Sequence, residues 1–515
     1  MSLQKYADKS KQTFSFCTQY RYFCTQKKTV KIEKTCKKCK IKIEFSCKNS
    51  LKHFEILCNC SNFALKFNKI TTMIVFKRKL YDKMLSWKQE NGTSALLIKG
   101  ARRTGKSTLA ENFAQQEYKS YILVDFSTVP PEVNELFNHI YDLDYFFLRL
   151  QVIYGVTLYE RNSVIIFDEV QMQPLARQAI KHLVKDGRYD YIETGSLLSI
   201  KKNVKDIVIP SEETRITLYP MDYEEFCWAM DDKTSVDLIR QMFNQKKPLG
   251  DSTNRMLMRK FRLYMLVGGM PQAVNEYITK NNFESVDRIK RNILELYEED
   301  FRKIDPLGRA SLLFSAIPSQ LNKNDARYKV SSVLENSRPS RLNEVIADMQ
   351  DSMTVNFAYH ADNPMVGMSM HKDINRYKMF LCDTGLFVTL AFKDKDFTEN
   401  TIYNKLLSDK LSVDLGYVYE NMIAQMLCAS GHGLYYYTFP KENSTHNYEV
   451  DFLLTKNNKI CPIEVKSSGY KTHKSLDAFS NKFSERVSEK YVISPKDLHK
   501  ENDVLYIPVY MTMFL

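Results

Sequence analysis

The chain has 515 residues, of which 44% are hydrophobic, and a formal net charge of +13. This length exceeds one ordinary domain, so we expect three or four domains. No apolar run approaches the roughly 18 residues of a membrane-spanning helix, and the first residues lack the apolar centre of a secretory signal. The composition therefore excludes a membrane protein and predicts a cytoplasmic one.

The positive charge is concentrated at the N-terminus. Of the 74 Lys and Arg residues and 61 Asp and Glu residues, residues 1–72 hold 16 and 4, which leaves 58 and 57 for residues 73–515. Most of the chain is thus nearly neutral. The net charge is therefore no argument for nucleic-acid binding, which would need a local basic face.

Residues 1–72 also hold seven of the eleven cysteines. The pairs Cys36/Cys39 and Cys58/Cys60 could supply four thiolates to a zinc ion, although the second pair is separated by one residue instead of the usual two. A Lys- and Phe-rich extension with little structure is one alternative. Another is an artefact of start-site choice, because the pattern of a self-contained domain begins at Met73. All three readings stay open.

The next feature is a nucleotide-binding pattern. Residues 95–98 form a short apolar run that predicts a buried strand, and Gly100, four further residues, Gly105, Lys106 and Ser107 follow, ahead of a helical pattern. This is the P-loop (Walker A) pattern G-x-x-x-x-G-K-[ST] between a strand and a helix. Backbone N–H groups of such a loop face the phosphates of ATP. Lys106 is expected to reach the β- and γ-phosphates, and Ser107 to ligate Mg²⁺.

The neighbouring loop and helix residues complete the predicted ATP contacts; they are Arg103, Thr104 and Thr108.

A second buried strand is predicted at residues 164–167 and ends in Asp168 and Glu169. Ligands of open α/β sheets bind at the carboxyl ends of the strands. Asp168 is therefore expected to hold Mg²⁺ through water, and Glu169 to orient and polarise the attacking water.

Two more strands are predicted at residues 121–126 and 189–194. The second ends near Thr194 and Ser196, either of which could sense the γ-phosphate or the attacking water. Arg215 could act as an arginine finger, in cis or in trans, or be an ordinary solvated side chain in a surface loop.

Residues 231–303 are predicted to be helical, with a helix stop at Gly268-Gly269. Residues 304–395 show a helix, a turn, a second helix and a β-type run, which favours a winged-helix unit. Such a unit can read DNA or bind a protein. Basic and acidic residues both accompany its second helix, and the acids would repel phosphate; they are Arg338 and Arg341 against Glu344, Asp348 and Asp351.

Near the C-terminus, two apolar runs are joined by the polar turn "TKNNK", which predicts an antiparallel hairpin. Asp451 on the first run is then expected to meet Glu464 and Lys466 on one exposed side of the sheet. A preceding helix has an apolar stripe with Glu420 at its border. A shared metal site would explain a carboxylate there. The alternative is ordinary charge on a half-exposed sheet.

In this order, the motifs resemble the prokaryotic AAA-type ATPases (AAA+ superfamily) that carry a C-terminal PD-(D/E)xK nuclease-like domain of uncharacterised function. The motifs are "GARRTGKSTL", "SVIIFDEVQ", "YIETGSLLSI", "LYPMDYEEF", "YMLVGGMPQAV", "LYEEDFRK", "FLCDTGLF", "GYVYEN", "EVDFLL" and "IEVKSS". The resemblance covers residues 73–515 and leaves residues 1–72 outside it.

The resemblance implies an α/β chain with four parts: a P-loop ATPase core (73–230), a helical lid (231–303), a winged-helix-like unit (304–395) and a nuclease-like domain (396–515). It also implies that Glu420, Asp451 and Glu464 bind Mg²⁺ and that Lys466 polarises the attacking water or the scissile phosphate. Val450 stands where the family pattern has proline.

Two functions follow as expectations. One is a Mg-ATP-driven machine whose C-terminal domain cuts or binds DNA or RNA. The other is a nucleotide-dependent switch that binds a protein partner and has no nuclease activity. An oligomer is compatible with both.

Overall fold

The structure is a computed structural model. It describes residues 30–36, 39–48, 51–58, 74–196, 208–323, 325–335, 342–393, 400–408, 416–442, 444–468 and 471–515, with backbone only for the first three ranges and for 400–402. The chain divides into two compact units, residues 1–74 and 75–515. In the described part of the chain, no helix combines the length and apolarity that crossing a membrane requires.

The first unit contributes an antiparallel sheet of β1 (Val30–Cys36), β2 (Cys39–Lys48) and β3 (Leu51–Cys58). The side chains of the cysteines proposed to bind zinc lie outside the described part of the chain, so the zinc site stays a prediction.

The second unit begins with a five-stranded parallel sheet in the order β5-β6-β7-β4-β8. Its strands are β4 (Ala95–Lys99), β5 (Ser120–Asp125), β6 (Ser163–Asp168), β7 (Asp190–Gly195) and β8 (Glu213–Thr217). The predicted strands are thus confirmed. Strand β8 is additional, and it holds Arg215, which we had expected in a surface loop.

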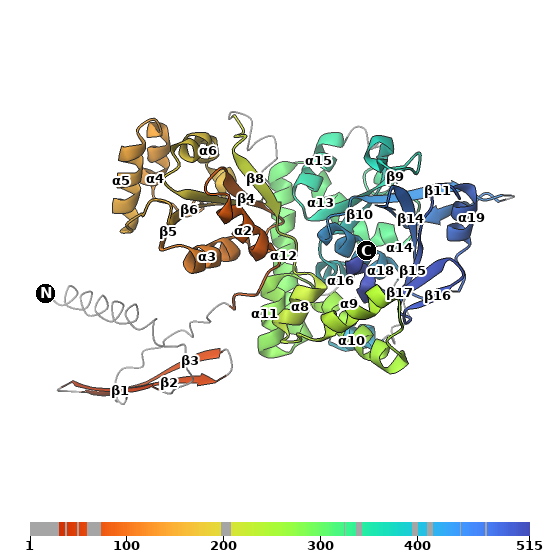
Figure 1. Cartoon of the computed structure of the whole chain (residues 1–515), viewed down its shortest axis with the longest axis horizontal. Helices are drawn as coiled ribbons and strands as arrows, with labels where there is room; N and C mark the ends of the chain where they lie inside the picture. Colours follow the sequence, from red (N-terminus) through yellow and green to blue (C-terminus); the bar gives the residue numbers. More distant parts are fainter. Residues whose placement is uncertain are drawn as a thin grey trace. The chain divides into compact units, whose positions relative to one another are not determined.

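Helices cover both faces of this sheet (Figure 1). They are α2 (Leu80–Gln89), α3 (Lys106–Glu117), α4 (Pro131–Leu136), η2 (Phe137–His139), α5 (Leu143–Tyr154), η3 (Val170–Met172) and α6 (Pro174–Asp186). Leu96 and Ile98 of β4 pack with α2 and α3, whereas Ala95 and Leu97 pack with α4, α5 and α6. Strand β4 is apolar from Ala95 to Ile98 because these residues are buried on both faces of the sheet.

The predicted helical segment is helical in the structure. Its helices, with those that flank it, are α8 (Tyr223–Ala229), α9 (Ser235–Gln245), α10 (Asp251–Val267), α11 (Pro271–Lys280), α12 (Phe283–Ile304), α13 (Arg309–Ser315) and α14 (Ile317–Asn322). Gly268 ends α10 with a positive φ of 84°, as the sequence predicted. An added Cβ at Gly269 would lie 2.1 Å from the carbonyl oxygen of Met221, so this turn packs directly on the backbone before α8.

The next elements are η4 (Val330–Ser332), α15 (Asn343–Asp351), β9 (Val355–Ala361), η6 (Met368–His371), β10 (Lys372–Leu381), α16 (Thr384–Ala391) and α17 (Asn400–Leu407). Residues 338 and 341, the basic pair of the expected winged helix, lie outside the described residues. The β9–β10 hairpin belongs to a four-stranded sheet with β11 (Leu434–Pro440) and β12 (Asn447–Val450), in the order β10-β9-β11-β12. The expected boundary at residue 395 therefore divides strands that share one sheet.

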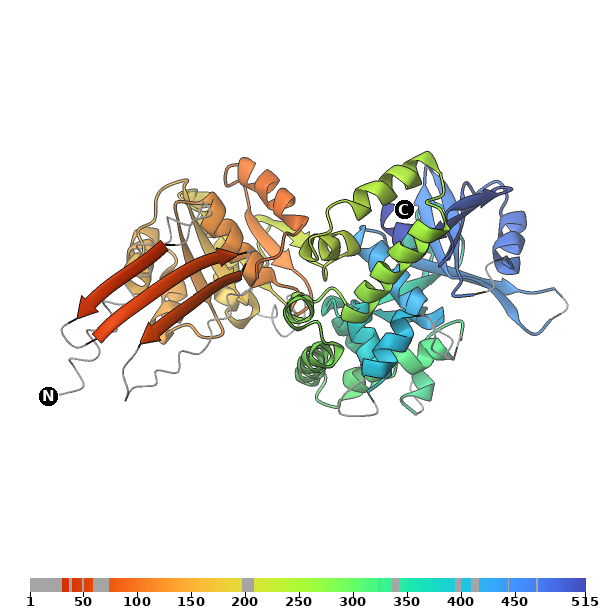
Figure 2. The same cartoon turned by 90° about the horizontal axis from the view of Figure 1, so that it is seen from below.

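A second five-stranded sheet follows in the order β13-β14-β15-β17-β16. Its strands are β13 (Phe452–Lys456), β14 (Lys459–Val465), β15 (Lys490–Ser494), β16 (His499–Glu501) and β17 (Val504–Pro508), and it is accompanied by α18 (Gly416–Ala429), α19 (Lys474–Lys482) and η7 (Val509–Phe514). The predicted β13–β14 hairpin is confirmed, with Asn457 and Asn458 at positive φ in its turn. Figure 2 shows these blue C-terminal strands from below.

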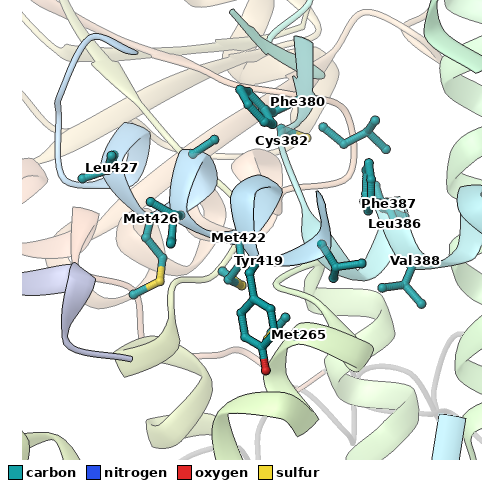
Figure 3. Packing of buried hydrophobic residues seen from close by; sticks show 14 of the residues in the cluster. Met265, Phe380, Cys382, Leu386, Phe387, Val388, Tyr419, Met422, Met426 and Leu427 are labelled. Atoms are coloured by element: carbon teal, nitrogen blue, oxygen red, sulfur yellow. The ribbon is translucent and has the colours of Figure 1, made fainter. Parts of the chain in front are cut away.

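One hydrophobic core joins the helical segment to the C-terminal sheets. Figure 3 shows side chains of α10, β10, α16 and α18 in contact, among them Met265, Phe380, Phe387 and Met422. The apolar stripe predicted for the helix around Glu420 is buried in this core. The C-terminal site is therefore built on a rigid base.

Candidate functional site

The P-loop lies at the carboxyl end of the central strand β4. Gly100 passes so close to the backbone of Leu218 that an added Cβ would lie 2.3 Å from its carbonyl oxygen. Gly105 has a φ of 94° and directly precedes the first residue of α3. Two positions that only glycine fits without strain thus turn the chain from strand to helix, which leaves the N-terminus of α3 facing the loop.

Lys106 is buried, with 6% of its surface exposed. Its ammonium donates to the carbonyl oxygens of Gly100 and Ala101, each at 3.0 Å. Burial lowers the pKa of Lys106 to about 8, although the charges of Glu169 and Asp168 act in the opposite direction. The ammonium is therefore held inside the loop by neutral carbonyl groups, which a phosphate can replace as partners.

Asp168, at the end of β6, accepts hydrogen bonds from two hydroxyl groups. Its Oδ1 accepts a hydrogen bond from Ser107 Oγ at 2.7 Å and another from the Thr194 hydroxyl at the end of β7. The ends of β6 and β7 and the first turn of α3, which follows β4 and the P-loop, thus bring these three side chains to one edge of the sheet.

Glu169 follows Asp168 with a φ of 53°, in the left-handed region that non-glycine residues rarely adopt. Its carboxylate accepts a hydrogen bond from the side-chain amide of Gln171. Backbone in this region is strained and is common at functional sites. Glu169 lies near enough to Lys106 for its charge to raise the pKa of that lysine.

The other predicted nucleotide residues are divided between loop, helix and sheet. Thr104 is buried and donates to Ala101 O at 2.9 Å, whereas Arg103 is exposed and Thr108 lies half-buried in the first turn of α3. Arg215 is half exposed on the edge strand β8 and forms an ion pair with Glu213 at 3.0 Å. It pairs in register with Leu97, within the strand and before its carboxyl end.

One set of loop contacts was not predicted from sequence. The guanidinium of Arg102 pairs with Asp300 of α12 at 3.0 Å, and the Tyr297 hydroxyl donates to Arg102 O at 2.9 Å. Both α12 residues line a small pocket with Ser196, Ser352 and Thr354. The negative charge of Asp300 also acts on Lys106.

The second candidate site lies between the two C-terminal sheets. Asp451 stands between β12 and β13, at the bend where the chain passes from the four-stranded to the five-stranded sheet. The sequence had predicted one continuous strand through this position. Asp451 Oδ2 accepts the Val465 backbone N–H at 2.7 Å, which fixes the carboxylate beside the end of β14.

The remaining predicted residues gather around Asp451. Glu464 is buried and its Oε1 lies 2.7 Å from the ammonium of Lys466. Glu420 of α18 lies 3.5 Å from the ammonium of Lys378 in β10, which also pairs with Glu449. The sequence thus predicted four members of this cluster and missed Lys378 and Glu449.

The acidic members raise one another's pKa. The pKa of Asp451 lies well above its ordinary value because of burial and the negative charges of Glu464 and Glu420. Burial also raises the pKa of Glu420 and of Glu464, against the opposing charges of Lys378 and Lys466 respectively. The cluster therefore holds more carboxylate than its two ammonium groups neutralise.

The donor atoms of the cluster are of a kind that binds a divalent metal, but their arrangement does not suit one. Its carboxylate oxygens suit Mg²⁺, and Glu464 Oε2 is buried with no hydrogen-bond partner. Yet, within the described ranges, no three Asp, Glu, His or Cys side chains are grouped as ligands of one metal ion. Glu420 and Glu449 instead lie against the ammonium of Lys378.

Models of three protein families match the chain. Residues 92–227 match an AAA domain, residues 258–396 match a domain of unknown function (DUF8612), and residues 415–511 match another (DUF4143). The chain is 22% identical over 448 residues to the uncharacterized protein MJ1637 of Methanocaldococcus jannaschii, which covers 83% of this chain and 86% of that protein.

Solved structures with likeness to the chain include a Walker-type ATPase and a branch migration motor. The Walker-type ATPase PABY2304 of Pyrococcus abyssi is 16% identical, covering 61% of this chain and 96% of that one, with a TM-score of 0.37. The RuvB Holliday junction branch migration motor of Thermotoga maritima is 15% identical, covering 56% and 90%, with a TM-score of 0.25. Both TM-scores are low, so the assignment rests on the matching domain model and on the P-loop geometry. The match to the AAA domain model and the P-loop geometry together support an AAA-type, nucleotide-binding ATPase domain within residues 92–227.

Proposed function

We propose that the protein binds and hydrolyses Mg-ATP at the P-loop and uses the nucleotide state to control its C-terminal α/β part. One observation supports hydrolysis most strongly. Ser107 and Thr194 both donate a hydrogen bond to the same oxygen of Asp168, beside the buried Lys106. This arrangement places hydroxyl, carboxylate and ammonium groups together where phosphate charge must be stabilised.

In this proposal, Lys106 leaves the carbonyl oxygens of its own loop and binds the β- and γ-phosphates. The N–H groups at the start of α3 bind the same phosphates, aided by the helix dipole. The oxygen donors of Ser107 and Asp168 fit Mg²⁺, which would neutralise phosphate charge when bound. Thr194 then stays beside Asp168, where a hydroxyl can report on the γ-phosphate.

Glu169 is the proposed general base. Its position beside Asp168 and its electrostatic influence on Lys106 keep a carboxylate near the phosphates without pairing it to the lysine. It would orient the attacking water and accept its proton. Arg215 remains a proposed arginine finger in trans, because its guanidinium is half exposed on the edge strand β8.

Helix α12 is the proposed link between the nucleotide and the rest of the chain. Asp300 and Tyr297 both bind Arg102 of the P-loop, and the same helix packs in the core that holds α10, α16 and the C-terminal sheets. A phosphate that attracts Arg102 would compete with Asp300 for the guanidinium. Loss of that ion pair would free the loop from α12, which gives hydrolysis a direct mechanical consequence.

For the C-terminal part, we propose nucleic-acid binding as the output. The supporting observation is that Glu420, Asp451, Glu464 and Lys466, the residue set expected for a PD-(D/E)xK site, lie in one cluster. The alternative output is a protein partner without nuclease chemistry. The near-neutral composition of residues 73–515 and the pairing of Lys378 with the acids favour that alternative.

One assay separates these outputs. Purified protein is incubated with mixed labelled DNA and RNA and with Mg²⁺ or Mn²⁺, beside an Asp451→Asn variant that keeps a hydrogen-bond acceptor for Val465. We expect retention of nucleic acid in a filter-binding assay, with no cleavage beyond that of the variant. Absence of retention would exclude nucleic acid in favour of a protein partner. Cleavage that the variant lacks would establish a nuclease.

A further inference from the structure

Lys378 is an unusual residue for its position in β10. Only 4% of its surface is exposed, and it lies in a run of buried residues that continues to Leu381. A buried ammonium is very costly unless it is paired. Lys378 is paired with Glu420 at 3.5 Å and with Glu449 in a shorter ion pair. Residues from α18 and β12 thus converge on a lysine from a third element.

The charges that face this ammonium come from α18, from β12 and from the bend before β13. Glu420 lies on α18, Glu449 on β12, and Asp451 at the bend before β13; each raises the pKa of Lys378 against the effect of burial. The ring of Tyr436 on β11 lies 5.7 Å from the ammonium. The charge of Glu464, which is paired with Lys466, also acts on Asp451.

A carboxylate that binds an ammonium directs its oxygen toward that ammonium. Glu420 and Glu449 both do so, and Asp451 directs Oδ2 to the Val465 N–H. This accounts for the finding that, in the part of the chain that the structure describes, the acids are not grouped as ligands of one metal ion. The ammonium lies where a cation would have to bind to contact Glu420 and Glu449 together.

We infer that Lys378 is the resident cation of the C-terminal acidic cluster and excludes a divalent metal ion from it. In the cluster, Lys378 then holds Glu420 and Glu449, and Lys466 holds Glu464. This deepens the proposed C-terminal output, because it gives a structural reason for binding without metal-dependent cleavage. The inference rests on that proposal only for the role of the site, because metal binding can be measured without nucleic acid and without ATP.

The test measures Mn²⁺ binding to the full-length protein in the absence of nucleotide. The electron paramagnetic resonance signal of free Mn²⁺ reports how much metal remains unbound. Wild type is compared with Asp451→Asn, Lys378→Met and the double variant. Lys456→Met is the matched control. Lys456 is the last residue of β13, and it is exposed and paired with Glu489. Thermal unfolding with and without Mn²⁺ gives a second readout that needs no enzymatic activity.

We expect wild type, Asp451→Asn and Lys456→Met to bind Mn²⁺ equally. Lys378→Met should bind Mn²⁺ about tenfold more tightly, because a repelling charge is removed from among carboxylates. Mn²⁺ should raise the midpoint temperature of this variant, and Asp451→Asn in the same chain should abolish both effects.

Two results would overturn the inference. One is a Mn²⁺ ion bound by wild type and absent from Asp451→Asn. The other is a folded Lys378→Met protein that binds Mn²⁺ no better than wild type. If Lys378→Met does not fold, the comparison of wild type with Asp451→Asn still tests whether the native cluster binds Mn²⁺. Failure here leaves the nucleic-acid retention assay unaffected, so the two proposals fail separately.

Discussion

Arg102 in the P-loop and Asp300 in α12 form an ion pair of 3.0 Å, although 198 positions separate them in the chain. The Tyr297 hydroxyl, one helical turn earlier, binds the Arg102 carbonyl oxygen. The loop expected to bind phosphate is therefore held by the helix that enters the large hydrophobic core. This pair is the connection that we propose between the nucleotide site and the C-terminal part.

The first prediction concerns that connection. Asp300→Asn should weaken the hold of α12 on the loop by only about 0.2–1 kcal/mol, since the pair is partly exposed. Hydrogen exchange of α12 should respond to ATP in the wild-type protein and respond much less in the variant.

Glu299→Gln is the matched control, because Glu299 is an exposed neighbour on the same helix. It should keep the wild-type response. An Asp300→Asn protein with an unchanged response to ATP would exclude this pair from the coupling.

The second prediction follows from the pKa of Lys106, which burial lowers from 10.5 to about 8. Above pH 8 the lysine in the nucleotide-free protein is largely neutral, and binding of phosphate must return a proton to it. ATP affinity should therefore fall as pH rises from 8 to 9.5, approaching about tenfold per pH unit. Calorimetry at pH 8.5 in buffers of different ionisation enthalpy should detect proton uptake.

The same lowered pKa affects stability with a defined sign. Between pH 8 and 10.5 the unfolded chain holds more protons at Lys106 than the folded chain does, so the contribution of this residue to stability increases with pH in that window. Lys106→Arg keeps a permanent charge and should bind ATP without the pH slope. A wild-type affinity independent of pH from 8 to 9.5 would contradict the assignment.

The third prediction tests the tight turn of the P-loop. Gly100→Ala places a Cβ 2.3 Å from the carbonyl oxygen of Leu218, so the loop or the strand must shift. We expect a loss of roughly 1–3 kcal/mol in the free energy of unfolding, together with weaker ATP binding.

Gly433→Ala is its control, because the contact there is the ring of Tyr435 at 3.1 Å, and a side chain can move more easily than backbone. Chemical denaturation measures the free energy of unfolding of both variants. Equal stabilities would show that the close approach at Gly100 is unimportant.

The fourth prediction concerns ATP affinity. Lys106→Ala removes the buried ammonium and should weaken ATP binding by about 10- to 150-fold, which corresponds to one hydrogen bond to a charged group. Fluorescence titration with a labelled ATP analogue measures this change. Affinity equal to that of wild type would contradict the assignment of the P-loop.

The strand, loop and helix around the P-loop were predictable because the information for them is local. The strand before Gly100, the glycine turn, Lys106 and Ser107 are contiguous, and their spacing alone requires a strand, loop and helix. Asp168 was predictable for a similar reason, since a polar residue that ends a fully apolar strand marks the carboxyl edge of a parallel sheet.

The contacts between distant segments were not predictable in this way. Lys378 lies within an apolar run, and nothing in the run specifies that Glu420 and Glu449 will face it. Asp451 was placed within one strand because alternation through it is regular, whereas tertiary structure divides the strand there between two sheets. A lysine inside a buried strand was the one available indication that a carboxylate partner must lie opposite.

The central claim is that this chain hydrolyses ATP with Glu169 as the general base. The most direct measurement is steady-state phosphate release by wild type and Glu169→Gln at saturating Mg-ATP, with Glu160→Gln, an exposed residue before β6, as control. We predict that Glu169→Gln binds ATP normally and turns it over about 100- to 10,000-fold more slowly, while the control matches wild type. Turnover by Glu169→Gln equal to that of wild type would contradict the account.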